Sequence, residues 1–140
     1  GNLGTILRAG EAAGITGVIM DSQTADIYNP KVIRSTMGAV FRVPFVYVED
    51  LKAALLQLKD HGVHLYAAHL KGQNPYDQED YTESTGFLIG NEAQGLSDEI
   101  ASLADTYVKI PMAGSVESLN AAIASSVLMF EVARQRRNQK

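Results

Sequence analysis

The chain has 140 residues, of which 46% are hydrophobic and 20% charged, and its formal net charge is −4. This length suits one domain with a buried core, and no apolar run reaches the roughly 18 residues that a membrane helix needs. Without cysteine the chain can form neither a disulfide framework nor a cysteine-ligated zinc site, a composition that fits a cytoplasmic protein.

Predicted helices and strands alternate along the whole chain. In chain order we expect a helix over 3–13, a strand over 17–20, a helix from Pro30 to about Met37, a strand over 43–48, a helix over 51–61, strands over 63–69 and 86–89, a helix over 96–103, a strand over 106–110 and a final helix starting near Glu117. Asn29 and Asp50 are typical helix N-caps, and Gly14 and Gly62 end the helices before them. A polar loop to about Thr82 follows the third strand.

Strands that alternate with helices indicate an α/β domain with a mostly parallel sheet and helices on both faces. In such sheets ligands bind beyond the carboxyl ends of the strands. Two glycine-containing segments begin there, one after Ile89 and one at Ile110. The glycine pattern of a classical dinucleotide fold and the Gly-Lys-Ser/Thr phosphate loop are both absent from the sequence.

The final helix is apolar around most of its circumference. One side carries Leu119, Ile123, Val127 and Phe130, which we expect to face the core. A second run of small or apolar residues consists of Ala121, Ala124, Ser125, Leu128, Met129 and Val132. A helix of this kind is usually buried on both sides, and a domain of this size has no second layer to cover the outer side. We therefore expect a partner subunit there.

Three short segments join glycines, which allow tight turns and close backbone approach, to fixed polar side chains. They are 2–8 (Asn-Leu-Gly-Thr-Ile-Leu-Arg), 90–96 (Gly-Asn-Glu-Ala-Gln-Gly-Leu), and 110–114 (Ile-Pro-Met-Ala-Gly) with Ser-Leu-Asn at 118–120. In this order and spacing they resemble the three signature motifs of the SpoU-type (TrmH-like) RNA 2′-O-ribose methyltransferases of the SPOUT superfamily. We call them motifs one, two and three.

The resemblance implies a SPOUT fold, in which the chain after the Ile-Pro-Met segment threads through an earlier loop as a C-terminal trefoil knot. It also implies S-adenosylmethionine as cofactor, 2′-O-methylation of a ribose in rRNA or tRNA, and no metal. Residues 1–140 would be the catalytic domain, without its first strand and any N-terminal RNA-recognition domain. Such enzymes are typically homodimers, which predicts an interface near residues 1–12 and 117–132, with Asn2 or Arg8 reaching toward the partner's cofactor pocket.

By resemblance, the catalytic residues are Asn2, Arg8, Glu92, Ser118 and Asn120. We expect Arg8 to bind the phosphate beside the target ribose and to stabilise a developing 2′-oxyanion. A role as general base is physically awkward, because a guanidinium loses its proton only above about pH 12. Glu92 would hold Arg8 through a charge-assisted hydrogen bond. Taken alone, Arg8 would be a solvated helix arginine and Glu92 a solvated loop carboxylate.

The resemblance places the cofactor among glycines and apolar residues. The expected contacts are Ala67, Ala68, Gly90, Asn91, Gly95, Ile110 and Met112, with Leu119 against the adenine. Asn91 occupies a position that varies in the family. Ile110 and Leu119 would serve equally well as ordinary core residues.

Two other classes of protein stay open. A catalytically silent knotted RNA-binding or assembly protein would keep the fold and lose Arg8, Glu92 or Asn120, all of which are present. An unrelated α/β enzyme that uses a nucleotide such as NAD would not need motif three. His61 falls at a helix end, and His64 and His69 fall near the two ends of one strand, where they point to opposite faces; this placement disfavours a metal site.

The charges are distributed unevenly. Residues 43–109 carry eleven acids and four bases, whereas 1–42 carry three acids and four bases and 110–140 two acids and four bases. The acidity therefore lies away from the ends that hold motifs one and three, although this domain alone should bind RNA weakly. The bases near the C-terminus resemble an RNA patch, but cations in the last turns of a helix are also favoured by its macrodipole.

Overall fold

The computed structural model describes residues 2–69, 72–91 and 94–139. In chain order its elements are α1 (Asn2–Ala13), β1 (Val18–Met20), α2 (Pro30–Ser35), η1 (Ala39–Phe41), β2 (Phe45–Tyr47), α3 (Leu51–Asp60), β3 (His64–Ala68), β4 (Asn74–Pro75), η2 (Tyr76–Gln78), β5 (Thr85–Leu88), α4 (Asp98–Ala101), β6 (Thr106–Lys109) and α5 (Ala121–Arg137).

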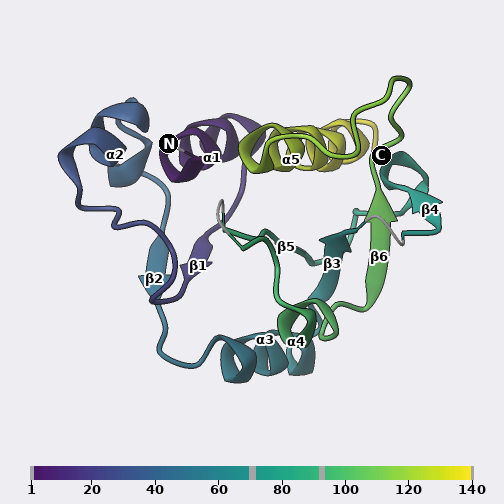
Figure 1. The fold of residues 1–140 in the computed structure, drawn as a ribbon, viewed down its shortest axis with the longest axis horizontal. Helices are drawn as coiled ribbons and strands as arrows, with labels where there is room; N and C mark the ends of the chain where they lie inside the picture. The colour runs from purple at the N-terminus through teal and green to yellow at the C-terminus, as the bar shows by residue number, and fades with distance from the viewer. Residues whose placement is uncertain (1, 70–71, 92–93, 140) are drawn as a thin grey trace.

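All neighbouring strands run parallel, and helices cover both faces of the strand layer. One sheet has the order β4-β6-β3-β5, and β1 and β2 form a separate pair. Helices α3 and α4 lie on one face, and α1 and α5 lie on the other (Figure 1). The predicted α/β class is confirmed, while the trefoil knot stays a prediction. No helix among the described residues is long and apolar enough to cross a membrane.

Local capping signals set several helix ends as expected. The side chain of Asn29 accepts a hydrogen bond from the Lys31 amide at 2.9 Å, and that of Asp50 accepts one from the Ala53 amide at 3.0 Å. Gly14 and Gly62 follow their helices with φ of 91° and 86°, a region that glycine enters without steric cost.

Two helices are shorter than predicted, and one strand is additional. The final helix begins at Ala121, because Asn120 rather than Glu117 is its N-cap. Helix α4 covers only Asp98–Ala101. The polar loop after β3 contains a two-residue strand, β4, which pairs with β6 at Val108 and Lys109. A strand that short has no periodicity from which the sequence could reveal it.

The expected core side of α5 is wrong. Ile123 and Phe130 are 54% and 45% exposed. Three members of the second run, Ser125, Leu128 and Met129, are buried instead, together with Ala122, which neither predicted side included. This side of α5 packs against α1, where a Cβ atom at Gly10 would lie 3.5 Å from the Met129 sulfur. The bulkier side of α5 therefore faces outward.

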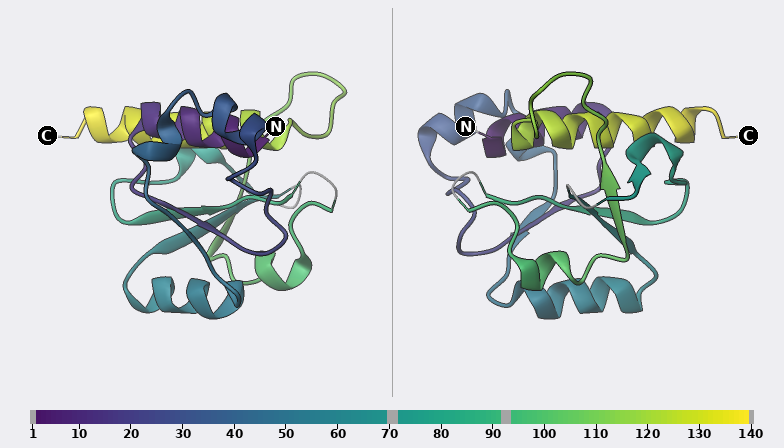
Figure 2. Two further views of the ribbon diagram at one scale, coloured as in Figure 1. Left: turned by 90° about the vertical axis from the view of Figure 1, so that its left-hand side faces the viewer. Right: turned by 45° about the vertical axis from the view of Figure 1, so that its right-hand side comes forward.

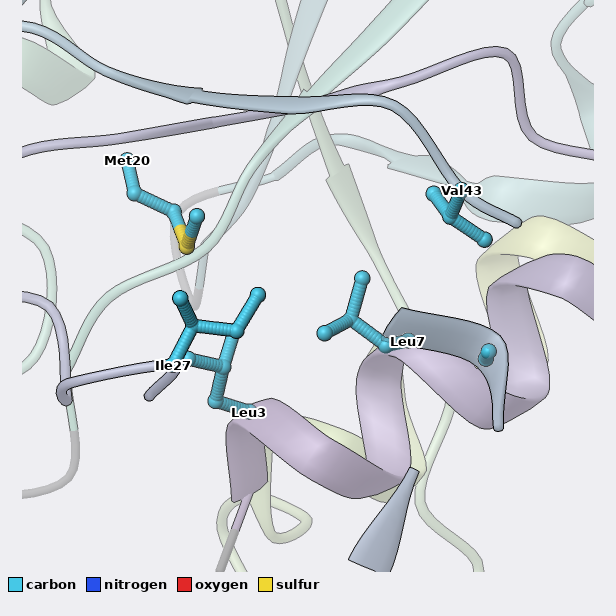
Figure 3. Close-up of a cluster of buried hydrophobic side chains, with 6 residues drawn as sticks. Leu3, Leu7, Met20, Ile27 and Val43 are labelled. Carbon is cyan, nitrogen blue, oxygen red and sulfur yellow. The ribbon is translucent and has the colours of Figure 1, made fainter. Parts of the chain in front are cut away.

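Three separate clusters of buried side chains make up the core. The first joins α1 to β1 and to the segments that follow it, through Leu3, Leu7, Met20, Ile27 and Val43 (Figure 3). Burying a leucine of this kind contributes roughly 1.5–3 kcal/mol. The second cluster lies between α3 and the larger sheet, and the third lies between that sheet and α5.

Both of the C-terminal arginines Arg134 and Arg136 have partners within the chain, and Arg136 holds α5 against the loop before β5. Arg136 donates hydrogen bonds to the carbonyl oxygens of Tyr81 at 3.1 Å and Glu83 at 2.8 Å. Arg134 forms an ion pair with Glu131 at 2.7 Å, one helical turn away. These two bases therefore have structural partners, which favours the structural interpretation of this basic segment over an RNA patch.

Candidate functional site

The segments expected to hold the cofactor follow three neighbouring strands. Ala67 of β3 is paired with Leu88 of β5 on one side and with Tyr107 of β6 on the other. Because the strands are parallel, their carboxyl ends lie at one edge of the sheet. Ala67 and Ala68 end β3, motif two follows β5, and motif three follows β6. The register thus brings all three segments to the same edge.

Gly90 opens motif two with a backbone contact that no other residue could make. A Cβ atom on Gly90 would lie 2.3 Å from the Gly95 carbonyl carbon and 2.3 Å from the Leu96 nitrogen. Such distances do not occur between real atoms, so the backbone itself would have to move. Gly95 has a φ of 67°, in the left-handed region. Both glycines are therefore required by the shape of the turn.

Asn91 holds the same turn together. Its side-chain oxygen accepts a hydrogen bond from the Gln94 amide at 2.7 Å, and its carbonyl oxygen accepts one from the Gly95 amide at 3.0 Å. This is a structural task that the sequence did not reveal, although asparagine is a common turn residue for this reason. Glu92, the predicted catalytic carboxylate, lies outside the described residues.

Motif one begins beside the motif-two turn. Asn2 and Leu3 line a cavity of about 1520 Å³ to which Gly90, Asn91 and Gly95 also contribute. Figure 2 shows α1 and α5 side by side, with both helices starting at the same end of the molecule. Motif one, the turn of motif two and the start of α5 therefore gather at one end.

Gly4 explains why motif one needs a glycine within the helix. A Cβ atom there would lie 1.6 Å from the Ser35 hydroxyl oxygen, so α1 and α2 touch at this point. A glycine inside a helix lowers stability by roughly 0.5–1 kcal/mol relative to alanine. Here the close packing of α1 against α2, which a larger residue would prevent, offsets that loss.

Arg8 presents its side chain to solvent. The residue is exposed, and no described residue forms an ion pair with it. It lies six positions after Asn2, roughly 120° away around the helix, and only Asn2 lines the large cavity. The structure therefore does not bring Arg8 and Asn2 to one cavity within this chain, and their joint action stays a prediction.

Asn120 is the N-cap of α5. Its side-chain oxygen accepts hydrogen bonds from the amides of Ala122 at 2.8 Å and Ile123 at 3.3 Å. Ser118 lies before the helix and is exposed; a helix starting near Glu117, as predicted, would have placed both Ser118 and Asn120 in its first turn. The amide group of Asn120 keeps its nitrogen for other partners, because the cap uses only the oxygen.

The remaining predicted cofactor residues differ in accessibility. Ala67 is fully buried and Ile110 packs against the third core cluster, so their side chains act as core. Ala68 is exposed, and Met112 and Leu119 are half-buried. None of these five lines the large cavity. Strand pairing thus places the end of β3, motif two and motif three next to one another, but of these three segments only motif two borders the large cavity.

An aromatic pair at the same edge escaped the sequence analysis. The rings of His69, just after β3, and Tyr107 of β6 stack with centroids 4.9 Å apart and planes 21° from parallel. Nothing in the sequence could show this pair, because it depends on the register between two strands 40 residues apart. Among the described residues no group of three or more acidic or histidine side chains is placed to hold a metal ion.

Comparison with known proteins agrees with the motifs. Residues 1–130 match the model of the SpoU rRNA methylase family. The chain is 35% identical over 132 residues to the 23S rRNA (guanosine(2553)-2′-O)-methyltransferase RlmP of Bacillus subtilis, covering 94% of this chain and 53% of that protein. It thus spans about half the length of the curated relatives it matches.

Solved structures give the same result. The SpoU methyltransferase AviRb from Streptomyces viridochromogenes superposes with a TM-score of 0.91 and 37% identity, over 98% of this chain and 55% of that one. A second AviRb structure is a complex with the cofactor AdoMet, with a TM-score of 0.88, 37% identity, and coverage of 99% and 54%. An AdoMet-bound rRNA methyltransferase from Sinorhizobium meliloti has a TM-score of 0.86 and 38% identity, with coverage of 95% and 51%.

Proposed function

Because this chain belongs to the SpoU rRNA methylase family, we propose that it is the catalytic domain of an RNA methyltransferase. The reaction is transfer of a methyl group from S-adenosylmethionine to a ribose 2′-hydroxyl of rRNA or tRNA. One observation supports this proposal: the three cofactor segments lie next to one another at one edge of the sheet. Ala67 and Ala68 end β3, motif two follows β5 and motif three follows β6.

The residues at this edge suit a cofactor held mainly by backbone groups. A Cβ atom at Gly95 or Gly114 would meet no atom within 4 Å, so the backbones of motifs two and three are open to a ligand. Ala68 adds a small exposed side chain between them. Apolar neighbours such as Met112 and Leu119 offer contact surface to an adenine ring without demanding charge.

The chemistry asks little of the protein beyond positioning. When bound, S-adenosylmethionine would supply a methyl group that its sulfonium already activates: the carbon–oxygen bond to the 2′-oxygen would form as the sulfur–carbon bond breaks, leaving S-adenosylhomocysteine, and the hydroxyl proton would pass to solvent. Arg8 binds the neighbouring phosphate and stabilises negative charge on the 2′-oxygen. Asn120 and Ser118 orient the acceptor, and Glu92 holds Arg8. Holding the reactants in line supplies much of the rate.

A two-fold dimer completes this proposal. The outward side of α5 exposes Ile123 and Phe130, and α1 runs beside it. Large apolar side chains gathered on one exposed face are typical of protein interfaces. If this partner also covered the exposed side of α1, it would meet Arg8. The active site would then form between two subunits, with Arg8 of one subunit beside the cofactor pocket of the other.

The substrate and location follow from the same family. Relatives named for rRNA and tRNA methylation support RNA as the partner of this chain. The exposed bases Arg8, Lys31 and Arg34 lie on α1 and α2, near the start of motif one, and would meet the phosphates. These two relatives come from bacteria, where such RNAs are made and used in the cytoplasm, so we place the enzyme there.

Two measurements on the full-length protein test the function. Isothermal titration calorimetry with S-adenosylmethionine and with NAD should give binding to the first and none to the second. Incubation with labelled S-adenosylmethionine and with rRNA and tRNA lacking modifications should label a ribose 2′-oxygen. Cofactor binding without transfer to any RNA would favour the catalytically silent protein, and binding of NAD alone would favour the unrelated enzyme.

A further inference from the structure

The surface of α1 and α2 carries positive charge. Residues 28–42, which include α2 and η1, contain three bases and no acid, although the whole chain has a net charge of −4. Lys31 and Arg34 of α2 and Arg8 of α1 are exposed, and none of the three forms an ion pair with a described residue. Such positive charges attract the phosphates of RNA.

Two large apolar side chains follow the bases of α2 along the chain. Phe41 is 84% exposed, the highest value among the large hydrophobic residues that the structure describes, and Met37 is 65% exposed. The core contacts of this segment come from other residues, since Ala39 and Val43 are buried in the first cluster and Val40 packs against it. Phe41 therefore contributes little to the core. An exposed aromatic ring beside cations is typical of surfaces on which unpaired bases stack.

Met37 adopts a backbone conformation that favours glycine. Its φ is 51°, and among the described residues no other non-glycine residue has a positive φ. It directly follows Thr36, the C-cap of α2, at the position where helices commonly place glycine. Strain of this kind persists where packing or function requires the side chain. Because the Met37 side chain is largely exposed, packing within this chain does not explain it.

Arg42 ties this segment to motif one. Its guanidinium donates to the Met37 carbonyl oxygen at 3.3 Å and to the Glu11 carboxylate at 2.8 Å. Glu11 lies three residues after Arg8, so the two are neighbours on the surface of α1. Helix α1 also contacts η1 directly. Figure 1 shows α2 and α5 on opposite sides of α1, so this segment is separate from the apolar side of α5 that is assigned to the dimer.

We propose that Phe41 and Met37 form a stacking site for an unpaired base of the RNA, at or next to the nucleotide whose ribose Arg8 engages. Lys31 and Arg34 would hold the flanking phosphates. This inference rests on the proposed function and narrows its substrate to a loop or bulge, because a base inside a duplex has both faces covered by its neighbours. Stacking on an aromatic ring tolerates every base, so the site selects unpaired structure rather than sequence.

Fluorescence anisotropy with the full-length protein tests the site on two labelled RNAs, a hairpin with an unpaired loop and a fully paired duplex of the same length. Phe41→Ala should weaken hairpin binding at least about fivefold, because it removes one stacking contact, and should leave duplex binding unchanged. Phe41→Trp should restore hairpin binding. Leu56→Ala, at a similarly apolar position on α3 that is 43% exposed, is the matched control and should bind both RNAs normally.

The salt dependence of binding separates stacking from charge. Arg34→Ala should weaken the binding of both RNAs and reduce the slope of log affinity against log salt concentration by about 1, since one phosphate contact is lost. Phe41→Ala should keep the native slope, because stacking releases no counterions.

Three outcomes would overturn the proposal. Native hairpin affinity in Phe41→Ala would refute the stacking site alone if the native protein methylates RNA. A native protein that binds S-adenosylmethionine but neither RNA would refute the proposed function as well. A dimer that Phe41→Ala converts to a monomer in light scattering without RNA would assign this surface to a second copy of the chain.

Discussion

Gly90 and Gly95 approach each other so closely that a Cβ atom on Gly90 would lie 2.3 Å from the carbonyl carbon of Gly95. This contact folds motif two into a turn at the carboxyl end of β5, beside the segments that follow β3 and β6. The atoms nearest to such a Cβ all belong to the backbone of Gly95 and Leu96, so this contact could not be relieved by moving a side chain.

We expect Gly90→Ala to lose most of its S-adenosylmethionine binding in calorimetry, because even one methyl group would force the turn apart. Gly62→Ala is the matched control. It strains a backbone with a φ of 86° after α3, where no atom lies within 4 Å of the added carbon. It should cost about 1 kcal/mol of stability and leave cofactor affinity unchanged. Unaltered affinity in a folded Gly90→Ala protein would rule out this turn as a cofactor contact.

Arg8→Ala should keep cofactor binding and the melting temperature, because the Arg8 side chain is exposed and contributes little packing. It should lower methyl transfer by about two orders of magnitude or more, because we assign Arg8 to binding the RNA phosphate and stabilising the 2′-oxyanion. Arg8→Lys should rescue poorly, since an ammonium cannot make a bidentate contact with phosphate. Lys52→Ala removes a positive charge on α3, where Lys52 pairs with Glu99 at 3.7 Å, and should transfer methyl groups normally. Near-normal turnover by Arg8→Ala would contradict the mechanism.

Two substitutions at Asn120 separate its capping role from a catalytic one. Asn120→Ala removes both hydrogen bonds to the start of α5 and should lower the free energy of unfolding by about 1 kcal/mol. Asn120→Asp keeps a capping oxygen, so its stability in denaturant should match the native protein. If the amide nitrogen takes part in the reaction, the Asp variant will still lose turnover. A fully active Asp variant would show that Asn120 is a cap alone.

Protonation of Glu131 should destabilise the protein in acid. Hydrogen bonds from Arg134 hold the pKa of this buried carboxyl below its ordinary value of 4.5, although burial acts in the opposite direction and Gln135 adds a weaker hydrogen bond. Because the folded pKa is lower than the unfolded one, the contribution is complete above about pH 4.5 and is lost as the pH falls through the folded value.

Denaturant unfolding between pH 7 and pH 3 measures this effect. The free energy of unfolding of the native protein should fall more steeply below about pH 4.5 than that of Glu131→Gln. Glu99→Gln, which removes the carboxylate of an exposed ion pair, should follow the native curve. Parallel curves for the native protein and Glu131→Gln would contradict the assignment.

The proposed dimer depends on the outward side of α5. Ile123→Glu or Phe130→Glu should convert a dimer to a monomer in light scattering of the full-length protein, because a charge in an apolar interface is poorly compensated. Leu56→Glu is a matched control on α3, where Leu56 is 43% exposed, close to the 45% of Phe130. It should leave the mass unchanged. A native protein that is monomeric at micromolar concentration and methylates RNA would refute the dimer.

Local chemistry determined much of this fold from the sequence. Asn29 and Asp50 cap helices through their own side chains, and Gly14 and Gly62 end helices through their own backbone freedom. These signals act within a few residues, so they can be recognised without knowing the rest of the structure. The alternation of helices and strands predicted the parallel sheet for the same reason. The order of the motifs along the chain likewise predicted the family.

Contacts between distant segments were decided only by the tertiary structure. The apolar residues of α5 surround the helix, so periodicity could not tell which side meets the core. Packing against α1 selected the side with Ser125 and Met129 and left Ile123 and Phe130 exposed. The strand register, which brings His69 beside Tyr107 and gathers the cofactor segments at one edge, likewise depends on pairings between distant residues: Ala67 pairs with Leu88, 21 residues on, and with Tyr107, 40 residues on. No local pattern encodes such distances, because they result from the combined packing of all the elements.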